Sequence, residues 1–325
     1  MSLHIIHPRT DGSSRATALR AVRRGELLTL RPGVFLRRAE WDQAPPWSRH
    51  LAMTAAAGLQ RPARIFCRQT ALVLYGVPLL GLTREVHARA SSDSRAGVSG
   101  GPGPRGLIPV RTVRPPVPRT GNADCFRGLF REQVRVGGGW LPVPDVRLDG
   151  GGEVRVQVEP LPLVLMDTVP RLGTQEAVVI LDAVLGGRSV LGRLDRDALA
   201  EAQQWLWSSR ARAAWERALG FADPRSESPG ESRSRVLIDE LGFAPPQLQT
   251  VLRLPDGGTA RLDFEWMREG VVGEFDGRIK FTEASRLSQT SPGEVYWAQV
   301  RREEAIRDTG RRLVRWEWDD LNRPR

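Results

Sequence analysis

The amino-acid sequence predicts an α+β protein with more than one domain. Its 325 residues are more than a typical single domain holds, and 40% of them are hydrophobic, which is enough for sizeable cores. Segments with apolar residues at helical spacing are interspersed with segments in which apolar and polar residues alternate, as in half-buried strands. The charge is uneven along the chain, which indicates that its two halves have different tasks.

These patterns divide the chain into three parts. Residues 1–47 combine a helix with a hairpin, residues 48–222 form a mixed α/β middle domain, and residues 223–325 form a second α/β domain. Inside the middle domain, residues 91–121 are rich in Ser, Gly, Pro and Arg, a composition typical of a long loop or linker. The arginines in this segment could follow a phosphate backbone, or the segment could be a solvated linker.

The N-terminal part combines a basic helix with a short basic hairpin. Residues 13–24 carry apolar side chains at helical spacing and end at Gly25, and residues 27–30 and 34–36 flank a tight turn, Arg31-Pro32-Gly33. A winged-helix module has these two parts, with the helix in the major groove of DNA and the wing at the backbone. The candidate DNA-contacting residues are Arg15, Arg20, Arg23, Arg24 and Arg31.

Residues 23–35, Arg-Arg-Gly-Glu-Leu-Leu-Thr-Leu-Arg-Pro-Gly-Val-Phe, resemble the N-terminal module of AbiEi-type antitoxins, and so does Cys67–Pro78. The resemblance implies a DNA-binding transcriptional regulator of a toxin–antitoxin system, with a cognate toxin or self-association among its contacts. Residues 1–12 leave no room for the earlier helices of a full winged helix. The module is therefore predicted to be partial, and it could have a purely structural role.

The middle domain is predicted from short periodic segments. Helices are expected at 47–59, 69–75, 161–169, 174–185 and 199–219, and a strand at 154–158. Trp205, Trp207 and Trp215 could be core residues or platforms for stacking bases. The core alternative is favoured, because tryptophan is highly buried on average.

Composition argues against several classes of protein. No apolar run approaches the ~20 residues that span a bilayer, and the N-terminal residues are too short and polar a run for a signal peptide. The two cysteines, Cys67 and Cys125, are far apart, which argues against a disulfide framework or a zinc ribbon. We therefore expect a cytoplasmic protein with no membrane partner and no small-molecule cofactor.

The charge distribution suggests DNA as a partner. Residues 1–135 hold 22 Arg against 8 Asp and Glu, a net charge of +14, whereas residues 226–325 hold 16 Lys and Arg against 18 Asp and Glu, a net charge of −2. A basic front half can hold a nucleic acid on which an acidic rear half acts. A high-GC genome would make arginine common throughout, but it does not explain the difference between the halves.

The C-terminal domain is organised around a predicted hairpin. Apolar and polar residues alternate through 262–266 and again through 271–275, and the four residues between these runs can form the turn. With this turn, Asp263 lies directly opposite Glu274. Both carboxylates then belong to a polar face, and the apolar residues of the two strands share the other face.

Like charges directly opposite each other destabilise a sheet. A fold keeps such a pair when a cation lies between them, and Mg²⁺ is a usual candidate because it binds one or two carboxylates together with waters and phosphate oxygens. The alternative is a solvated outer face of an amphipathic hairpin. On that face Arg261 would neutralise Asp276, which lies opposite it, and Glu265 would be a further solvated carboxylate.

The neighbouring segments complete an ordered set. A helix is expected from 228 to 241, strands at 247–254 and 259–266, a helix at 294–308 and a strand at 313–318. With the strand at 271–275, the order is helix, three strands, helix, strand.

This order, with Asp263 on the second strand and Glu274-Phe275-Asp276 on the third, resembles the PD-(D/E)XK nuclease superfamily. More narrowly, residues 274–280, Glu-Phe-Asp-Gly-Arg-Ile-Lys, and 313–321, Leu-Val-Arg-Trp-Glu-Trp-Asp-Asp-Leu, resemble the Vsr-like nuclease domains of a bacterial family of unknown function. The resemblance covers about residues 226–325 and implies a restriction-endonuclease-like fold. One departure is that the superfamily usually has Lys two residues after the Glu, where this chain has Asp276.

The resemblance implies metal-assisted phosphodiester hydrolysis, with Mg²⁺ or Mn²⁺ lowering the pKa of a bound water. Asp263 and Glu274 would be metal ligands, with the backbone carbonyl of Phe275 as a third. Glu231 resembles the helix glutamate of the superfamily, which holds a water or a second metal. Because Ser228-Pro-Gly-Glu231 is also a capping box, Glu231 could equally be a helix cap.

Lys280 is the only lysine in the chain and follows Glu274 by six residues. Its ammonium could stand in for the missing lysine by neutralising the phosphorane or orienting the water. The four histidines are far in sequence from these carboxylates, so a histidine–metal site is not expected there. The candidate catalytic set is Asp263, Glu274, Asp276, Lys280 and Glu231.

Two functions from different classes remain open at this point. The first is a metal-dependent DNA endonuclease with an attached DNA-binding region, supported by three carboxylates on the predicted hairpin. The second is a non-catalytic DNA-binding regulator similar to AbiEi antitoxins, whose nuclease-like domain is a scaffold. The second is supported by the departure from the superfamily pattern at Asp276.

Overall fold

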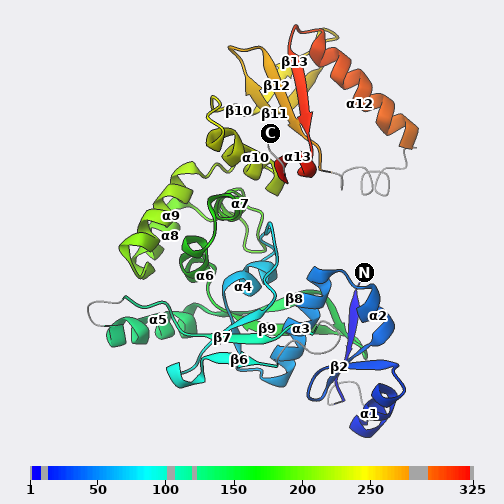
Figure 1. The fold of residues 1–325 in the computed structure, drawn as a ribbon, viewed down its shortest axis with the longest axis vertical. Coiled ribbons are helices and arrows are strands. Elements are labelled where there is room, and N and C mark those ends of the chain that lie inside the picture. The colour runs from blue at the N-terminus through cyan, green and yellow to red at the C-terminus, as the bar shows by residue number, and fades with distance from the viewer. Residues whose placement is uncertain (1, 9–13, 101–106, 119–122, 278–291, 323–325) are drawn as a thin grey trace. The chain divides into compact units, whose positions relative to one another are not determined.

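The computed structural model describes residues 2–8, 14–100, 107–118, 123–277 and 292–322. Over these residues the chain is a mixed α/β protein with two separate sheets (Figure 1). It divides into two compact units. Unit 1 comprises residues 1–172 and 189–217, and unit 2 comprises residues 173–188 and 218–325.

Unit 1 is built on a nine-stranded mixed sheet with the strand order β2-β3-β1-β8-β9-β4-β5-β7-β6. The strands are β1 (Leu3–Ile6), β2 (Leu27–Arg31), β3 (Val34–Arg37), β4 (Ile65–Phe66), β5 (Val86–Arg89), β6 (Gly97–Ser99), β7 (Val110–Val113), β8 (Gly139–Leu148) and β9 (Glu153–Val158). The helices are α1 (Arg15–Arg23), α2 (Arg38–Gln43), α3 (Pro46–Gln60), α4 (Arg68–Leu74), α5 (Ala123–Gly137), α6 (Leu161–Thr168) and α8 (Arg196–Ala202). Helix α9 (Ser209–Phe221) contains the boundary between the units.

The first 47 residues belong to this sheet and do not form a module of their own. The predicted helix and hairpin are present: Ser14 caps α1 by accepting the N–H of Thr17, and β2 pairs with β3 in antiparallel fashion. However, β1 was not predicted, and it joins β3 on one side to β8 on the other, where Leu3 pairs with Val146. The hairpin is therefore the edge of a larger sheet, which differs from the predicted partial winged helix.

The segment 91–121 is more than a linker, because its described part supplies two strands. Strand β7 pairs in parallel with β5 and in antiparallel fashion with β6. Strand β8 also lies outside the predicted elements. Of the three tryptophans, Trp205 and Trp215 are buried as predicted, whereas Trp207 is partly exposed and carries the guanidinium of Arg171 over its ring, 4.2 Å from the centroid.

Helix α3 packs against the sheet of unit 1 and is buried along most of its length. A glycine permits this close approach. A Cβ atom at Gly58 would come within 2.5 Å of Cγ1 of Val156 on β9. The buried side of α3 also carries His50, whose Nε2 lies 3.2 Å from Oγ1 of Thr70, and the same hydroxyl oxygen accepts the N–H of His87 on β5.

Unit 2 contains the predicted order of helix, three strands, helix and strand. Its elements are α7 (Thr174–Leu185), α10 (Pro229–Glu240), β10 (Gln247–Arg253), β11 (Thr259–Trp266), β12 (Val271–Phe275), α12 (Pro292–Arg307), β13 (Arg312–Trp316) and α13 (Trp318–Asn322). The sheet order is β10-β11-β12-β13, in which the first three strands are antiparallel and β13 is parallel to β12. Helix α7, predicted for the middle domain, packs against α10, with Arg235 Nη1 2.8 Å from Asp182 Oδ2.

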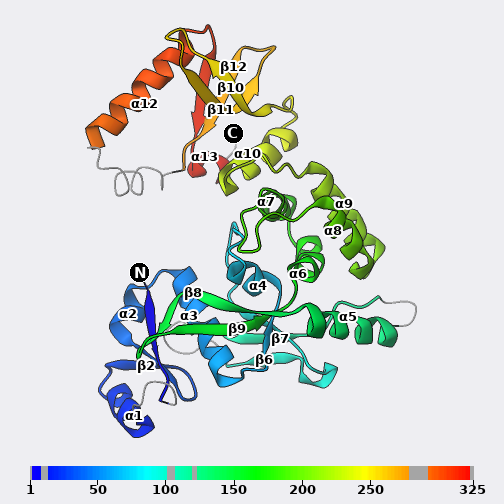
Figure 2. The ribbon, with the colours of Figure 1, turned by 180° about the vertical axis from the view of Figure 1, so that it is seen from behind.

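Two core clusters lie against the sheet of unit 2. Leu262 belongs to a buried cluster with Ile306 of α12, whereas Phe264 belongs to a second cluster with Leu321 of α13 and the partly buried Leu237 of α10. Both ribbon views show α12 running beside β13 (Figures 1 and 2). The simple alternation predicted that the apolar residues of β11 share one face of the sheet. They are instead divided between two cores. No described helix combines the length and the apolar composition needed to cross a membrane.

Candidate functional site

The hairpin β11–β12 has the predicted register. Phe264 pairs with Gly273, Glu265 with Val272, and Trp266 with Val271. The turn is the predicted four residues, 267–270. The observed pairs end at Phe264 and Gly273; extended by one residue, the same register would place Asp263 opposite Glu274, as the sequence predicts.

Glu274 is buried, and two arginines neutralise it. Arg315, its direct partner on the parallel strand β13, places Nη2 2.7 Å from Oε2. Arg302 of α12 places Nη2 2.8 Å from Oε1 and Nη1 3.2 Å from Oε2. The cation expected between opposing carboxylates is thus supplied, in this structure, by guanidinium groups.

Asp263 is half-buried and turns toward the backbone of β12. Its Oδ2 accepts the N–H of Phe275 at 3.1 Å, and its Oδ1 lies 3.5 Å from Nε2 of Gln249. Phe275, expected to contribute its carbonyl to a metal, thus contributes its N–H to Asp263.

Glu231 is buried at the start of α10 and makes helix-capping hydrogen bonds, although its carboxylate accepts the N–H of Glu227 and not, as in a strict capping box, that of the N-cap Ser228. Ser228 Oγ accepts the N–H of Glu231 at 3.2 Å, and the carboxylate accepts the hydroxyl of Ser228 and the N–H of Glu227, both at 2.8 Å. The same carboxylate accepts Nε2 of Gln249 at 3.1 Å. The helix-cap alternative is therefore confirmed, and Glu231 shares the amide of Gln249 with Asp263 of the hairpin.

Gln249 links Glu231 to Asp263, and sequence reasoning missed it. It lies within β10 opposite Asp263, between the residue pairs Leu248–Phe264 and Thr250–Leu262. Its φ of 52° is in the left-handed region, which non-glycine residues rarely adopt. Its Oε1 is buried and accepts no hydrogen bond within the described ranges. The sequence carries no signal for such a backbone, because glutamine is an ordinary residue in a strand.

The polar face of the hairpin is not solvated, which contradicts the alternative of an exposed amphipathic hairpin. Glu265 is 3% exposed and pairs with Arg311, with Nε 2.9 Å from Oε1. Arg261 was expected to neutralise Asp276, but its ion pair is with Glu227 at 2.6 Å. Asp276 instead has Nη1 of Arg315 3.4 Å from its Oδ2. Lys280 lies outside the described residues.

The candidate DNA-contacting arginines divide into two groups. Arg15, Arg20, Arg23 and Arg24 are exposed on or just after α1, where Arg20 donates to Thr17 Oγ1 and Arg24 forms an ion pair with Glu26. Arg31 is 9% exposed and donates to the backbone carbonyls of Ser99 and Ile108. Burial also lowers the pKa of Arg31. Its predicted role as a surface contact is therefore wrong, because its side chain ties the end of β2 to Ser99 of β6 and to Ile108, which precedes β7.

The carboxylate site offers oxygen donors, which suit Mg²⁺ or Mn²⁺. Gln249 Oε1 and Glu274 Oε1 are buried without a hydrogen bond from any described residue, although Arg302 Nη2 lies 2.8 Å from the latter as an ion pair. No group of three or more His, Cys, Asp or Glu side chains in the described ranges is arranged to hold a metal ion. The oxygen atoms of this site are therefore of the kind that a hard cation binds. In this structure, however, the guanidinium groups of Arg302 and Arg315 neutralise Glu274.

The residues themselves are the basis for inferring function, because no protein-family model and no curated protein matches this chain.

Proposed function

We propose that this protein is a metal-dependent endonuclease that hydrolyses phosphodiester bonds in DNA. The observation that carries the proposal is the convergence of Glu231, Asp263 and Glu274 from α10, β11 and β12. Gln249 contacts the first two, and the hairpin register sets the third opposite the second. Carboxylate oxygens are the donors that a divalent cation prefers, although these three side chains are not already arranged as a metal site among the described residues.

A divalent cation held by Asp263 and Glu274, with Glu231 beside them, would neutralise the scissile phosphate and lower the pKa of a bound water. The other residues orient this set. The Phe275 N–H holds Asp263, and the Gln249 amide holds Glu231 close to it. We propose that Asp276 and Lys280, which follow Glu274, act at the same phosphate, with the ammonium neutralising negative charge.

Arg302 and Arg315 have a part in this proposal that the sequence did not indicate. Both guanidinium groups lie within 3 Å of the Glu274 carboxylate. Positive charge fixed in a partly buried site stabilises a phosphate as negative charge develops on it. We infer that these two arginines contribute to phosphate binding as well as to the stability of Glu274.

A specific observation also favours the second function, a non-catalytic DNA-binding regulator of AbiEi type. The two arginines already compensate Glu274, so the fold does not need a metal to bury this carboxylate. In that case unit 2 would be a scaffold, and unit 1 would bind DNA through α1, with a toxin or a second copy as a further partner.

The two functions are separated by metal-dependent stability and nicking. In the endonuclease, Mn²⁺ should raise the melting temperature of the whole chain by an amount set by its affinity and concentration. Asp263→Asn should abolish both this rise and the nicking of supercoiled DNA in Mg²⁺ or Mn²⁺. Asp308→Asn, a change at an exposed aspartate of unit 2, should abolish neither. DNA binding should survive in both variants.

If the wild type shows no metal-dependent rise and no nicking of several DNA and RNA substrates, the endonuclease proposal fails and the regulator is the better assignment. A rise in melting temperature that persists in Asp263→Asn would mean that the metal binds elsewhere, and it would also count against the proposed site.

A further inference from the structure

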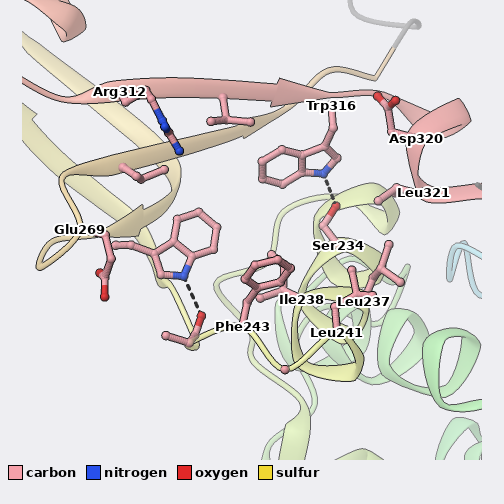
Figure 3. A pocket seen from close by; sticks show the side chains of 15 residues that line it. Ser234, Leu237, Ile238, Leu241, Phe243, Glu269, Arg312, Trp316, Asp320 and Leu321 are labelled. Carbon is pink, nitrogen blue, oxygen red and sulfur yellow. Dashed lines mark hydrogen bonds between the residues drawn. The ribbon is translucent and has the colours of Figure 1, made fainter. Parts of the chain in front are cut away.

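Unit 2 contains a cavity that the proposed function does not use. It lies between α10, the loop that follows it, and the strands β11, β12 and β13, and its volume is about 610 Å³ (Figure 3). Small-molecule sites commonly have volumes of roughly 300–1,000 Å³ and mainly apolar walls. The walls here are formed largely by Trp266, Trp316, Phe243, Leu237 and Val314.

The polar atoms of the two indoles are already satisfied within the protein. Trp266 Nε1 donates to the backbone carbonyl of Ala244 at 2.6 Å, and Trp316 Nε1 donates to Oγ of Ser234 at 2.7 Å. Figure 3 shows the bond from Trp316 to Ser234, and both tryptophans line the cavity. The interior therefore favours a flat, apolar body, because a polar group placed there would find no free indole donor.

One cation is available at the rim of the cavity. Figure 3 shows the Arg312 side chain reaching from β13 toward the cavity, whereas the carboxylates of Glu269 and Asp320 point away from it. Among the residues that the structure describes, the guanidinium of Arg312 has no hydrogen bond or ion pair, while Asp320 accepts the N–H of Glu317 at 2.8 Å. A guanidinium group with unused donors matches a carboxylate, to which it can donate two parallel hydrogen bonds.

We propose that this cavity binds a small aromatic carboxylate. The aromatic ring lies between the indoles of Trp266 and Trp316, and the carboxylate accepts hydrogen bonds from Arg312. Ring stacking accounts for the aromatic class, since aromatic pairs gain energy beyond the area that they bury. Charge complementarity with Arg312 accounts for the carboxylate.

The cavity is separate from the carboxylate site. Successive residues of a strand point to opposite faces of the sheet, and on β13 the cavity residues Arg312, Val314 and Trp316 alternate with Arg315, the partner of Glu274. The proposal therefore does not depend on the endonuclease activity, and its ligand is not a substrate of that site.

Calorimetric titration of the full chain with naphthalene-2-carboxylate and with its neutral analogue naphthalene-2-methanol tests the proposal. The carboxylate should bind more tightly than the alcohol. Arg312→Gln should weaken carboxylate binding by about tenfold or more, since a hydrogen bond to a charged group typically contributes that much, and should leave alcohol binding unchanged. Arg253→Gln, at an exposed arginine of β10 that does not line the cavity, should change neither.

Val314→Trp should place an indole inside the cavity and obstruct the binding of both probes, with melting temperature confirming that the variant folds. Three outcomes overturn the proposal: no binding of either probe at millimolar concentration, equal affinity for the two probes in wild type and Arg312→Gln, or binding that survives Val314→Trp. Sedimentation tests whether the cavity is occupied by a second copy of the chain. If the wild type self-associates and Val314→Trp is monomeric, the cavity is a contact between copies of the chain and the proposal fails.

Discussion

Glu274 and Arg315 are directly paired residues of the neighbouring parallel strands β12 and β13, and their side chains form a largely buried ion pair with Nη2 2.7 Å from Oε2. The same guanidinium lies 2.8 Å from Oε1 of Glu303 and 3.4 Å from Oδ2 of Asp276. One arginine therefore serves three carboxylates. The positive charge of Arg315 offsets the repulsion expected between Glu274 and Asp263, which would otherwise destabilise the sheet.

Arg315→Met should destabilise the protein. The substitution leaves Glu274, whose side chain is 7% exposed, with Arg302 as its remaining cation among the residues that the structure describes. Breaking a buried pair costs about 3–5 kcal/mol, and the second arginine should reduce this to about 2–3 kcal/mol. Urea unfolding of the full chain measures the difference in free energy.

Arg301→Met is the matched control, since Arg301 precedes Arg302 on α12 and is exposed. It should change the free energy of unfolding by no more than about 0.5 kcal/mol. Equal stability of the two variants would show that the ion pair between Arg315 and Glu274 contributes nothing to the fold.

Gln249→Gly should be more stable than Gln249→Ala. Both variants lose the amide that links Glu231 to Asp263. Only the alanine variant keeps a Cβ atom at the φ of 52°, where a non-glycine residue costs about 1–2 kcal/mol. Urea unfolding should therefore rank glycine above alanine by about 1 kcal/mol. The reverse order would mean that this backbone conformation is not the one adopted in solution.

Stability should fall as the pH decreases from 6.5 toward 4, because of two buried histidines. Burial lowers the pKa of His50 and of His87 from 6.5 to about 4. Each ring therefore stays neutral in the folded protein while it is protonated in the unfolded chain. The stabilisation is present above pH 6.5 and is lost as the pH falls through this range, by about 2–3 kcal/mol for each histidine.

Urea unfolding at a series of pH values measures this loss. The double variant His50→Gln and His87→Gln should show a flatter dependence between pH 6.5 and 4. His4→Gln, at a histidine whose side chain is 43% exposed, should keep the dependence of the wild type. If the double variant and the wild type have the same slope, other groups cause the pH dependence.

Features that depend on residues close together in the sequence could be predicted, whereas contacts between distant residues could not. The turn of four residues and the alternation around it were enough to predict the register of the observed pairs, from Phe264 with Gly273 to Trp266 with Val271, because hairpin register is a local property. The partners that bury Glu274 could not be predicted in the same way. Arg302 and Arg315 lie on a later helix and strand, and many other arginines in the chain were equally plausible partners.

The N-terminal part shows the same limit. Its helix and hairpin follow from residues close in sequence, and both are present. The pairing of Leu3 with Val146 is distant in the chain, and four residues of β1 are too short a pattern to predict it. This pairing turns an apparent winged helix into a sheet edge. A different distant contact, with the carbonyls of Ser99 and Ile108, holds the buried Arg31, which the sequence had placed on the surface.

The DNA-binding proposal can be tested by comparing exposed arginines with Arg31. Each phosphate contact that is lost should reduce the slope of log affinity against log salt concentration by about 1. The double variant Arg15→Gln and Arg23→Gln, at two exposed positions of α1, should therefore bind duplex DNA with a slope smaller by about 2. Arg31→Gln should leave the slope unchanged, because its guanidinium is bonded to the carbonyls of Ser99 and Ile108.

Arg31→Gln should instead destabilise the fold, by about 1–3 kcal/mol, since the partly buried hydrogen bonds from its guanidinium to Ser99 and Ile108 would be lost. Fluorescence anisotropy with a labelled duplex at several salt concentrations measures the slope, and urea unfolding measures the stability of both variants. The double variant should unfold like the wild type, because Arg15 and Arg23 are exposed. If Arg31→Gln flattens the salt dependence while Arg15→Gln and Arg23→Gln do not, the β2–β3 turn and not α1 is the part of unit 1 that contacts DNA.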